Sequence, residues 1–166
     1  MILALVAVFA LACFKWGSWR NWKEYYPSIL FLIVGNMAYS HIFKNYMLWT
    51  YEGFINQTIA SFTTMFFLYP TVVILFLSRF PDSMVFKVAY VLVWSLGCTL
   101  LEFFSVSMGW FAFYRGWNIF WSLVLYVIGF ILVRLHHRHP LIVWPIGAAL
   151  AAATMLLFHM PFNLLE

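Results

Sequence analysis

The chain has 166 residues, of which 66% are hydrophobic and 8% are charged, whereas about a quarter of the residues are charged in an ordinary soluble domain. A soluble fold of this length has too little interior to hide that much apolar surface, so the composition excludes a soluble globular protein. The net charge of +4 comes from basic residues scattered between apolar runs, which favours lipid headgroups over nucleic acid as their neighbours.

Continuous apolar runs predict transmembrane helices, because a barrel strand would alternate in hydropathy. A bilayer core about 30 Å thick needs about 20 helical residues to cross it. We therefore expect an all-α, polytopic transmembrane bundle that forms a single domain over residues 1–166. Its six spans are expected at about 1–15, 28–43, 60–78, 84–108, 118–135 and 140–159.

The first apolar run, MILALVAVFALAC, carries its charges after it and has none before it. This order is the reverse of a signal peptide, so we expect the run to be the first span. The next stretch, Trp16–Lys23, repeats a tryptophan every three residues among basic side chains. It predicts a short helix at the inner headgroup layer, either as an anchor or as a dock for anionic headgroups.

Prolines and small residues mark further features of the spans. Pro27 stands at the expected entrance of the second span, where a missing N–H costs little. Pro70 lies inside the third span and should kink it. The last span carries small residues over 147–152, a pattern that permits close packing and predicts a face for a homo- or hetero-oligomer.

The basic residues predict the orientation of the bundle. Only Lys44 and Arg115 belong to the second and fourth loops. The first, third and fifth loops with their flanks hold the other seven: Lys15, Arg20, Lys23, Arg79, Lys87, Arg134 and Arg138. Basic residues accumulate on the cytoplasmic side, so we expect these three loops inside and both termini outside.

One acidic residue, Glu102, interrupts the apolar run GCTLLEFFSVSMG of the fourth span. It precedes Gly109 by seven residues, which places it about 10 Å below the outer surface. An ionised carboxylate at mid-membrane costs about 2.5–3.5 kcal/mol, so it should face the bundle interior or water. Protonation, pairing with Arg115 and a hydrogen bond from Asn36 are all open at this point.

Helical spacing gathers polar side chains at the depth of Glu102. We therefore predict a polar cavity that opens outward. Its expected ligand-binding residues lie in the outer half of the bundle: Glu102, Asn36, Ser40, Thr99, Ser105, Asn118, Ser122 and Tyr126, with His41, Arg115 and Trp117 nearer the surface. The alternative is that Glu102 only staples helices together by hydrogen bonds.

The histidines of VRLHHRHP lie beside two arginines at the expected inner surface. Neighbouring histidines on a helix point in different directions and the arginines repel a cation, so we expect no metal site there. We expect Arg134–His139 to form a solvated basic collar near anionic headgroups. Cys13 and Cys98 are expected to be packing residues, and Asn56 begins an NQT glycosylation sequon.

Three stretches resemble a family of small uncharacterised multi-pass membrane proteins of endospore-forming Gram-positive bacteria: YYPSILFLIVGNMAYS, LLEFFSVSMGWFAFYRGWN and GWNIFWSLVLYVIGFILVRLHHRHPLIVW. The resemblance covers about Trp22 to Trp144. The acid Glu102, the Gly-Trp-Asn at 116–118 and the Arg-Leu-His at 134–136 carry it. It implies the bacterial cytoplasmic membrane and no established activity.

These observations favour a non-enzymatic membrane protein that binds or passes a small solute, a proton or a lipid headgroup around Glu102. No catalytic residue, metal or cofactor is required by any motif. A membrane scaffold or subunit of a larger assembly is one alternative. An intramembrane enzyme that uses Glu102 with histidines is another.

Overall fold

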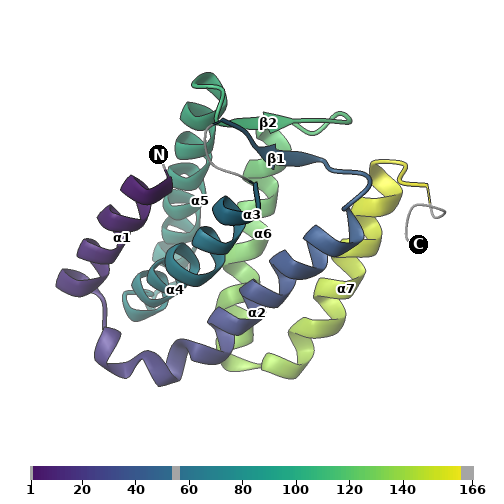
Figure 1. The fold of residues 1–166 in the computed structure, drawn as a ribbon. Coiled ribbons are helices and arrows are strands. Elements are labelled where there is room, and N and C mark those ends of the chain that lie inside the picture. Colours follow the sequence, from purple (N-terminus) through teal and green to yellow (C-terminus); the bar gives the residue numbers. More distant parts are fainter. Residues whose placement is uncertain (1, 54–56, 162–166) are drawn as a thin grey trace.

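A computed structural model describes residues 2–53 and 57–161, and Asn56 of the sequon lies outside them. Six helical rods make up most of the fold (Figure 1). Their bounds are α1 Ile2–Trp16, α2 Trp22–Ile42, α3 Gln57–Thr63 continuing through a π-helical turn Thr64–Leu68 into α4 Tyr69–Ser78, α5 Met84–Ser107, α6 Ile119–Arg138 and α7 Pro140–Leu157. The predicted helical class is confirmed.

Four of these rods are long and apolar enough to cross a bilayer: Gln57–Ser78, Met84–Ser107, Ile119–Arg138 and Pro140–Leu157. The apolar part of α1 is shorter, and α2 has 21 residues but is less apolar than the others. Large apolar side chains cover the outside of the rods, and Leu141 is 83% exposed. Lipid is the solvent that accommodates such a surface, so the chain is an integral membrane protein.

The ends of the rods sort into two groups (Figure 1). The connections α1–α2, α4–α5 and α6–α7 lie at the lower end in this view. The start of α1, the end of α7 and two short strands lie at the upper end. The sequence assigns most basic residues to the lower connections and their flanks, so the two ends of the bundle differ in charge.

The two strands close the upper end and were not predicted from the sequence. β1 Trp49–Tyr51 pairs antiparallel with β2 Phe111–Phe113, and Thr50 lies opposite Ala112. The N–H of Glu52 donates to the Trp110 carbonyl at 2.9 Å and extends the pairing. The ribbon thus ties the α2–α3 connection to the α5–α6 connection.

The π-helical turn lies just before Pro70 and explains how the third rod accommodates a proline. The N–H of Tyr69 donates to the Thr64 carbonyl five residues earlier, where an α-helix would use the fourth. Proline has no N–H and its ring clashes with the carbonyl four residues back. A widened turn before the proline relieves this clash, whereas the kink expected at Pro70 stays a prediction.

A tight corner joins α1 to α2 and replaces the short interfacial helix expected over Trp16–Lys23. The corner holds one 3₁₀ turn, Trp19–Asn21, and α2 then begins at Trp22. Pro27 therefore lies inside α2 instead of at its entrance. Gly17 allows the corner, because a Cβ there would approach the Cys13 carbonyl oxygen to 2.7 Å. The Arg79 Nε donates to the Trp16 carbonyl at 3.1 Å and attaches the corner to the end of α4.

Two apolar clusters hold the rods together. The larger lies among α1, α2, α4, α5 and α6 around the fully buried Phe76, whose ring packs against Tyr90 and Phe130. The smaller lies at the upper end around Leu48 and Trp117. Glu102 and its neighbours occupy the space between α5 and α6 below this second cluster.

Candidate functional site

Glu102 faces α6 and is held there by two hydroxyl groups. The Ser122 hydroxyl donates to one carboxyl oxygen, and the Tyr126 hydroxyl donates to the other. Ser122 and Tyr126 are four residues apart on α6, so they occupy the same helix face one turn apart. The Trp117 indole Nε1 donates to the Ser122 Oγ at 2.9 Å. This chain of donors orients the carboxyl group between α5 and α6.

Neutral donors therefore take the place of the ion pair considered from the sequence. The Arg115 guanidinium lies 4.0 Å from the centre of the Tyr46 ring. The amide of Asn36 donates to the Tyr69 hydroxyl at 2.8 Å. Two hydroxyl donors leave the negative charge of an ionised Glu102 without a compensating positive charge among its hydrogen-bond partners.

A cavity of about 130 Å³ lies beside this carboxyl group. Apart from Leu125, its lining side chains are aromatic or polar. The aromatic ones are Tyr39, Trp49, Tyr51, Tyr69, Phe111, Trp117 and Tyr126. The polar ones are Asn36, Ser40, Thr50, Gln57, Ser61, Glu102 and Ser122. Among the described residues that line it there is no lysine, arginine or histidine. Glu102 is thus the one ionisable carboxyl group in a cavity whose described walls carry no basic side chain.

Hydrogen bonds and ring contacts fix the aromatic walls. The Tyr39 hydroxyl accepts from the N–H groups of Leu48 and Trp49 at 3.2 and 3.3 Å. The Tyr39 and Trp49 rings stack with centroids 3.9 Å apart. The Trp49 ring in turn lies 4.6 Å from that of Trp117. The walls are therefore set by the fold before any ligand enters.

The rod that contains the π-helical turn supplies another part of the wall, through Gln57, Ser61 and Tyr69. Thr64 is buried in this turn, donates to the Ala60 carbonyl at 3.0 Å and shares a hydrogen bond of 3.1 Å with the Tyr51 hydroxyl. Tyr69 follows the turn and receives the hydrogen bond from Asn36. The site thus draws on α2, β1, the α3–α4 rod, β2, α5 and α6.

Six of the eleven residues predicted for the site line the cavity: Glu102, Asn36, Ser40, Trp117, Ser122 and Tyr126. The other five have different surroundings. Thr99 and Ser105 donate to carbonyls of their own helix four residues earlier. Asn118 caps α6 by accepting from the N–H groups of Phe120 and Trp121. His41 is exposed near the end of α2, and Arg115 lies on Tyr46.

Most of the aromatic walls, namely Tyr39, Trp49, Tyr51, Tyr69 and Phe111, were not predicted from the sequence. Tryptophan and tyrosine near span ends are common interfacial anchors, so their position alone carried no sign of a cavity. A usable signal was the pair of short aromatic segments WTY and FAF in the two upper connections.

The histidines of VRLHHRHP do not form the expected solvated collar. His136 is buried, lies 3.2 Å from the Ser28 hydroxyl and stacks on Phe31. His137 stacks on Tyr25, while His139 is exposed. The prediction was wrong for His136 because this side of α6 packs on α2 and is closed to headgroups. Within residues 2–53 and 57–161, no group of three or more His, Cys, Asp or Glu side chains is arranged to hold a metal ion.

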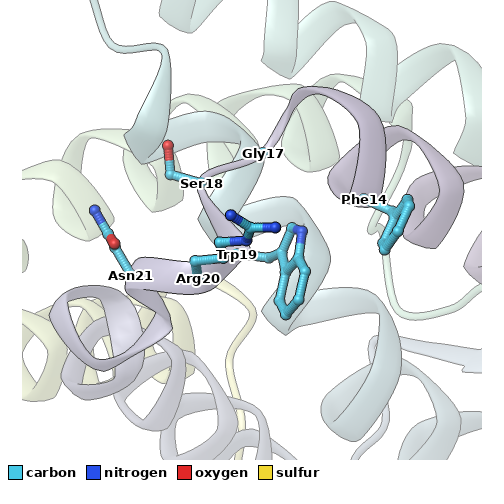
Figure 2. A pocket seen from close by; sticks show the side chains of 6 residues that line it. All are labelled: Phe14, Gly17, Ser18, Trp19, Arg20 and Asn21. Atoms are coloured by element: carbon cyan, nitrogen blue, oxygen red, sulfur yellow. The ribbon is translucent and has the colours of Figure 1, made fainter.

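A second hollow, of about 460 Å³, lies at the α1–α2 corner (Figure 2). Phe14 and residues 17–21 line it. The Phe14 and Trp19 rings stack with centroids 5.8 Å apart, and the Arg20 guanidinium lies 5.8 Å from the Trp19 ring. An exposed basic group beside exposed aromatic rings is typical of a membrane interface.

The apolar rods and their lipid-facing surfaces define the class of the protein as an integral membrane protein. No family model matches the chain. No curated protein and no solved structure is significantly similar to it either.

Proposed function

We propose that the protein crosses the bacterial cytoplasmic membrane six times and receives a small solute, a proton or a lipid headgroup in the cavity around Glu102. The observation that carries this proposal is the carboxyl group of Glu102, which two neutral hydroxyls orient beside a cavity. No basic side chain lies among the described residues that line this cavity. Intramembrane acids are costly and mark binding or transfer sites as a rule.

The proposed orientation has both termini outside and the cavity open to the outer side. It rests on the basic residues, seven of which belong to the loops at one end of the bundle. The same distribution supports contacts between the α1–α2 corner and anionic headgroups on the inner side. The resemblance to multi-pass proteins of endospore-forming bacteria supports the cytoplasmic membrane as the location.

Cysteine labelling tests the access that this proposal requires. In a variant without Cys13 and Cys98, Ser61→Cys would place a thiol on the cavity wall. A membrane-impermeant thiol reagent added to intact cells should modify it. Thr99→Cys is the matched control, because Thr99 lies on α5 without lining the cavity and should stay unmodified.

Two further substitutions test the orientation in the same cells. Ser107→Cys, at the end of α5, should react from outside, and Ser83→Cys, before α5, should react only after permeabilisation. If Ser61→Cys does not react under any condition, the cavity is closed and the proposed function fails. If Ser83→Cys reacts in intact cells, the orientation is reversed.

Proteoliposomes then test the role of the carboxyl group. Proton flux or solute binding should be lost in Glu102→Gln, which keeps the size of the side chain and removes its charge. Glu52→Gln is the control, because Glu52 also accepts from a tyrosine hydroxyl, that of Tyr114, but lies exposed outside the cavity. Equal behaviour of the two variants would remove Glu102 from the mechanism.

A scaffold role is the second candidate, and the position of α7 favours it. This rod lies at one side of the bundle (Figure 1), and Ala148, Ala149, Ala152 and Ala153 on it are exposed. Small exposed residues on a spanning helix permit close approach of another helix. Co-purification from native membranes tests the candidate: a stoichiometric partner lost on Ala152→Leu and kept on Glu102→Gln would support it.

A further inference from the structure

We propose that the cavity around Glu102 selects a small ammonium cation, such as a methylated amine, over neutral and anionic solutes. The inference rests on the proposed function, since it requires that the cavity admits a ligand. It specifies the chemical class of that ligand from the charge, the walls and the size of the cavity.

The charge of the cavity is the first argument. The described lining residues include one carboxyl group and no basic side chain. The two groups that hold Glu102 are hydroxyls, which donate hydrogen bonds and bring no positive charge. A carboxylate in a partly desolvated site binds a cation more strongly than in water, because little solvent screens the attraction.

The aromatic walls are the second argument. Tyr39, Trp49, Tyr51, Phe111 and Trp117 come from three different parts of the chain and surround one small space. The face of an aromatic ring attracts a cation placed within about 6 Å of its centre, and rings grouped around a carboxylate are a general solution for binding quaternary ammonium groups. A ring face that attracts a cation repels an anion.

The number of ligating oxygens argues against a divalent metal ion. Calcium takes six to eight oxygen ligands, and magnesium requires an octahedral set that usually includes carboxylates. Here a single carboxylate lines the described cavity, and both of its oxygens already accept hydrogen bonds. A diffuse organic cation needs no such coordination sphere.

The size of the cavity is the third argument. A water molecule takes about 30 Å³ in the liquid, so a cavity of about 130 Å³ holds a group of about four or five heavy atoms. Methylated ammonium groups have this size. The cation can come from a soluble amine or from the headgroup of a lipid, and the experiment below distinguishes these sources.

Thermal unfolding in lipid nanodiscs of phosphatidylglycerol alone tests the inference, because these discs supply no ammonium headgroup. Tetramethylammonium chloride should raise the melting temperature in a saturable manner. Sodium chloride at the same ionic strength and the neutral analogue tert-butyl alcohol should not. In discs that also contain phosphatidylethanolamine, a lipid source would raise the starting melting temperature and reduce the added shift, whereas a soluble source leaves the shift the same.

Two matched pairs of variants connect the effect to the site. Glu102→Gln should weaken the apparent affinity for tetramethylammonium by at least about thirtyfold, and Glu52→Gln should leave it unchanged. Phe111→Leu should weaken it by about tenfold through loss of a ring face. Phe113→Leu is its control on the same strand, because Phe113 packs in the upper apolar cluster instead of lining the cavity.

An equal saturable shift with tert-butyl alcohol, or one that survives Glu102→Gln, overturns the ammonium inference and leaves the proposed function intact. The absence of any saturable shift with tetramethylammonium overturns it as well. In that case the labelling of Ser61→Cys separates the two claims: a reactive thiol preserves an accessible cavity with another ligand, and an unreactive thiol ends the proposed function too.

Discussion

Tyr126→Phe is expected to destabilise the bundle by removing one of the two hydroxyl donors to Glu102. The substitution keeps the ring, which packs against the larger apolar cluster, and removes only the oxygen. Ser122 remains bonded to the other carboxyl oxygen. The change therefore isolates one hydrogen bond between a neutral donor and a carboxyl group inside the membrane.

Two general magnitudes bracket the expected loss. Hydrogen bonds to charged groups contribute about 1.5–3 kcal/mol in proteins, and polar contacts between membrane helices contribute about 0.6 kcal/mol on average and about 1.7 at most. The Glu102 carboxyl group is partly buried and keeps one donor after the change. We therefore expect Tyr126→Phe to lower the free energy of unfolding by about 1–2 kcal/mol.

The assay is equilibrium unfolding in mixed micelles, followed by helical circular dichroism. Tyr114→Phe is the control, because it removes a bond of the same chemistry, from a tyrosine hydroxyl to Glu52, at an exposed position. Solvent replaces that bond, so Tyr114→Phe should leave stability unchanged. A double-mutant cycle of Tyr126→Phe with Glu102→Gln should give a coupling free energy of about 1 kcal/mol.

Two results would refute this reasoning. Equal effects of Tyr126→Phe and Tyr114→Phe would mean that burial adds nothing to the Glu102 contact. Strict additivity of Tyr126→Phe and Glu102→Gln would mean that the two side chains do not interact, and the orientation of the carboxyl group would then need another cause.

Three further outcomes are expected. Gly17→Ala should lower the free energy of unfolding by about 1–3 kcal/mol, because the new Cβ would meet the Cys13 carbonyl. Gly97→Ala is its control, because a Cβ there has nothing within 4 Å. This control should leave the free energy of unfolding unchanged or raise it by up to about 1 kcal/mol in the same micelle assay. Asn118→Ala should cost about 1 kcal/mol in that assay through loss of the α6 cap, and Asn118→Ser should restore most of it. Burial raises the pKa of Tyr51. The stability that the protonated Tyr51 side chain contributes is therefore full below the ordinary tyrosine pKa of about 10 and is lost as pH rises through the raised pKa. Tyr51→Phe should flatten the fall of the unfolding midpoint at alkaline pH, and an unchanged slope would exclude Tyr51 as the cause of that fall.

Hydropathy located the helices well because the apolar runs are continuous and prolines or polar turns separate them. The expected fourth and sixth spans, 84–108 and 140–159, differ from α5 and α7 by one and two residues at their ends. The second span was placed six residues late. Pro27 seemed to mark its start, yet α2 begins at Trp22 and runs through this proline, which lies inside the helix.

The site was less predictable, because its parts come from distant segments. Glu102 and Ser122 could be placed by depth along two helices. The sequence could not place Tyr51 and Phe111, which lie opposite each other in the two-stranded ribbon. Nothing local indicates that two short aromatic stretches 60 residues apart will pair. Asn118 was assigned to the cavity by depth, although an asparagine immediately before an apolar helix is also a capping signal.

The widened turn before Pro70 has a consequence for every side chain that follows it on the same rod. A helix advances about 100° for each residue, and one additional residue in a turn rotates the downstream segment by that angle relative to the upstream one. Tyr69 reaches Asn36 in this rotated phase. Deleting a single residue between 64 and 68 would rotate Tyr69 out of the cavity wall. The same rotation would turn the lipid-facing side of α4 toward the protein. The length of this segment is therefore fixed more tightly than its composition.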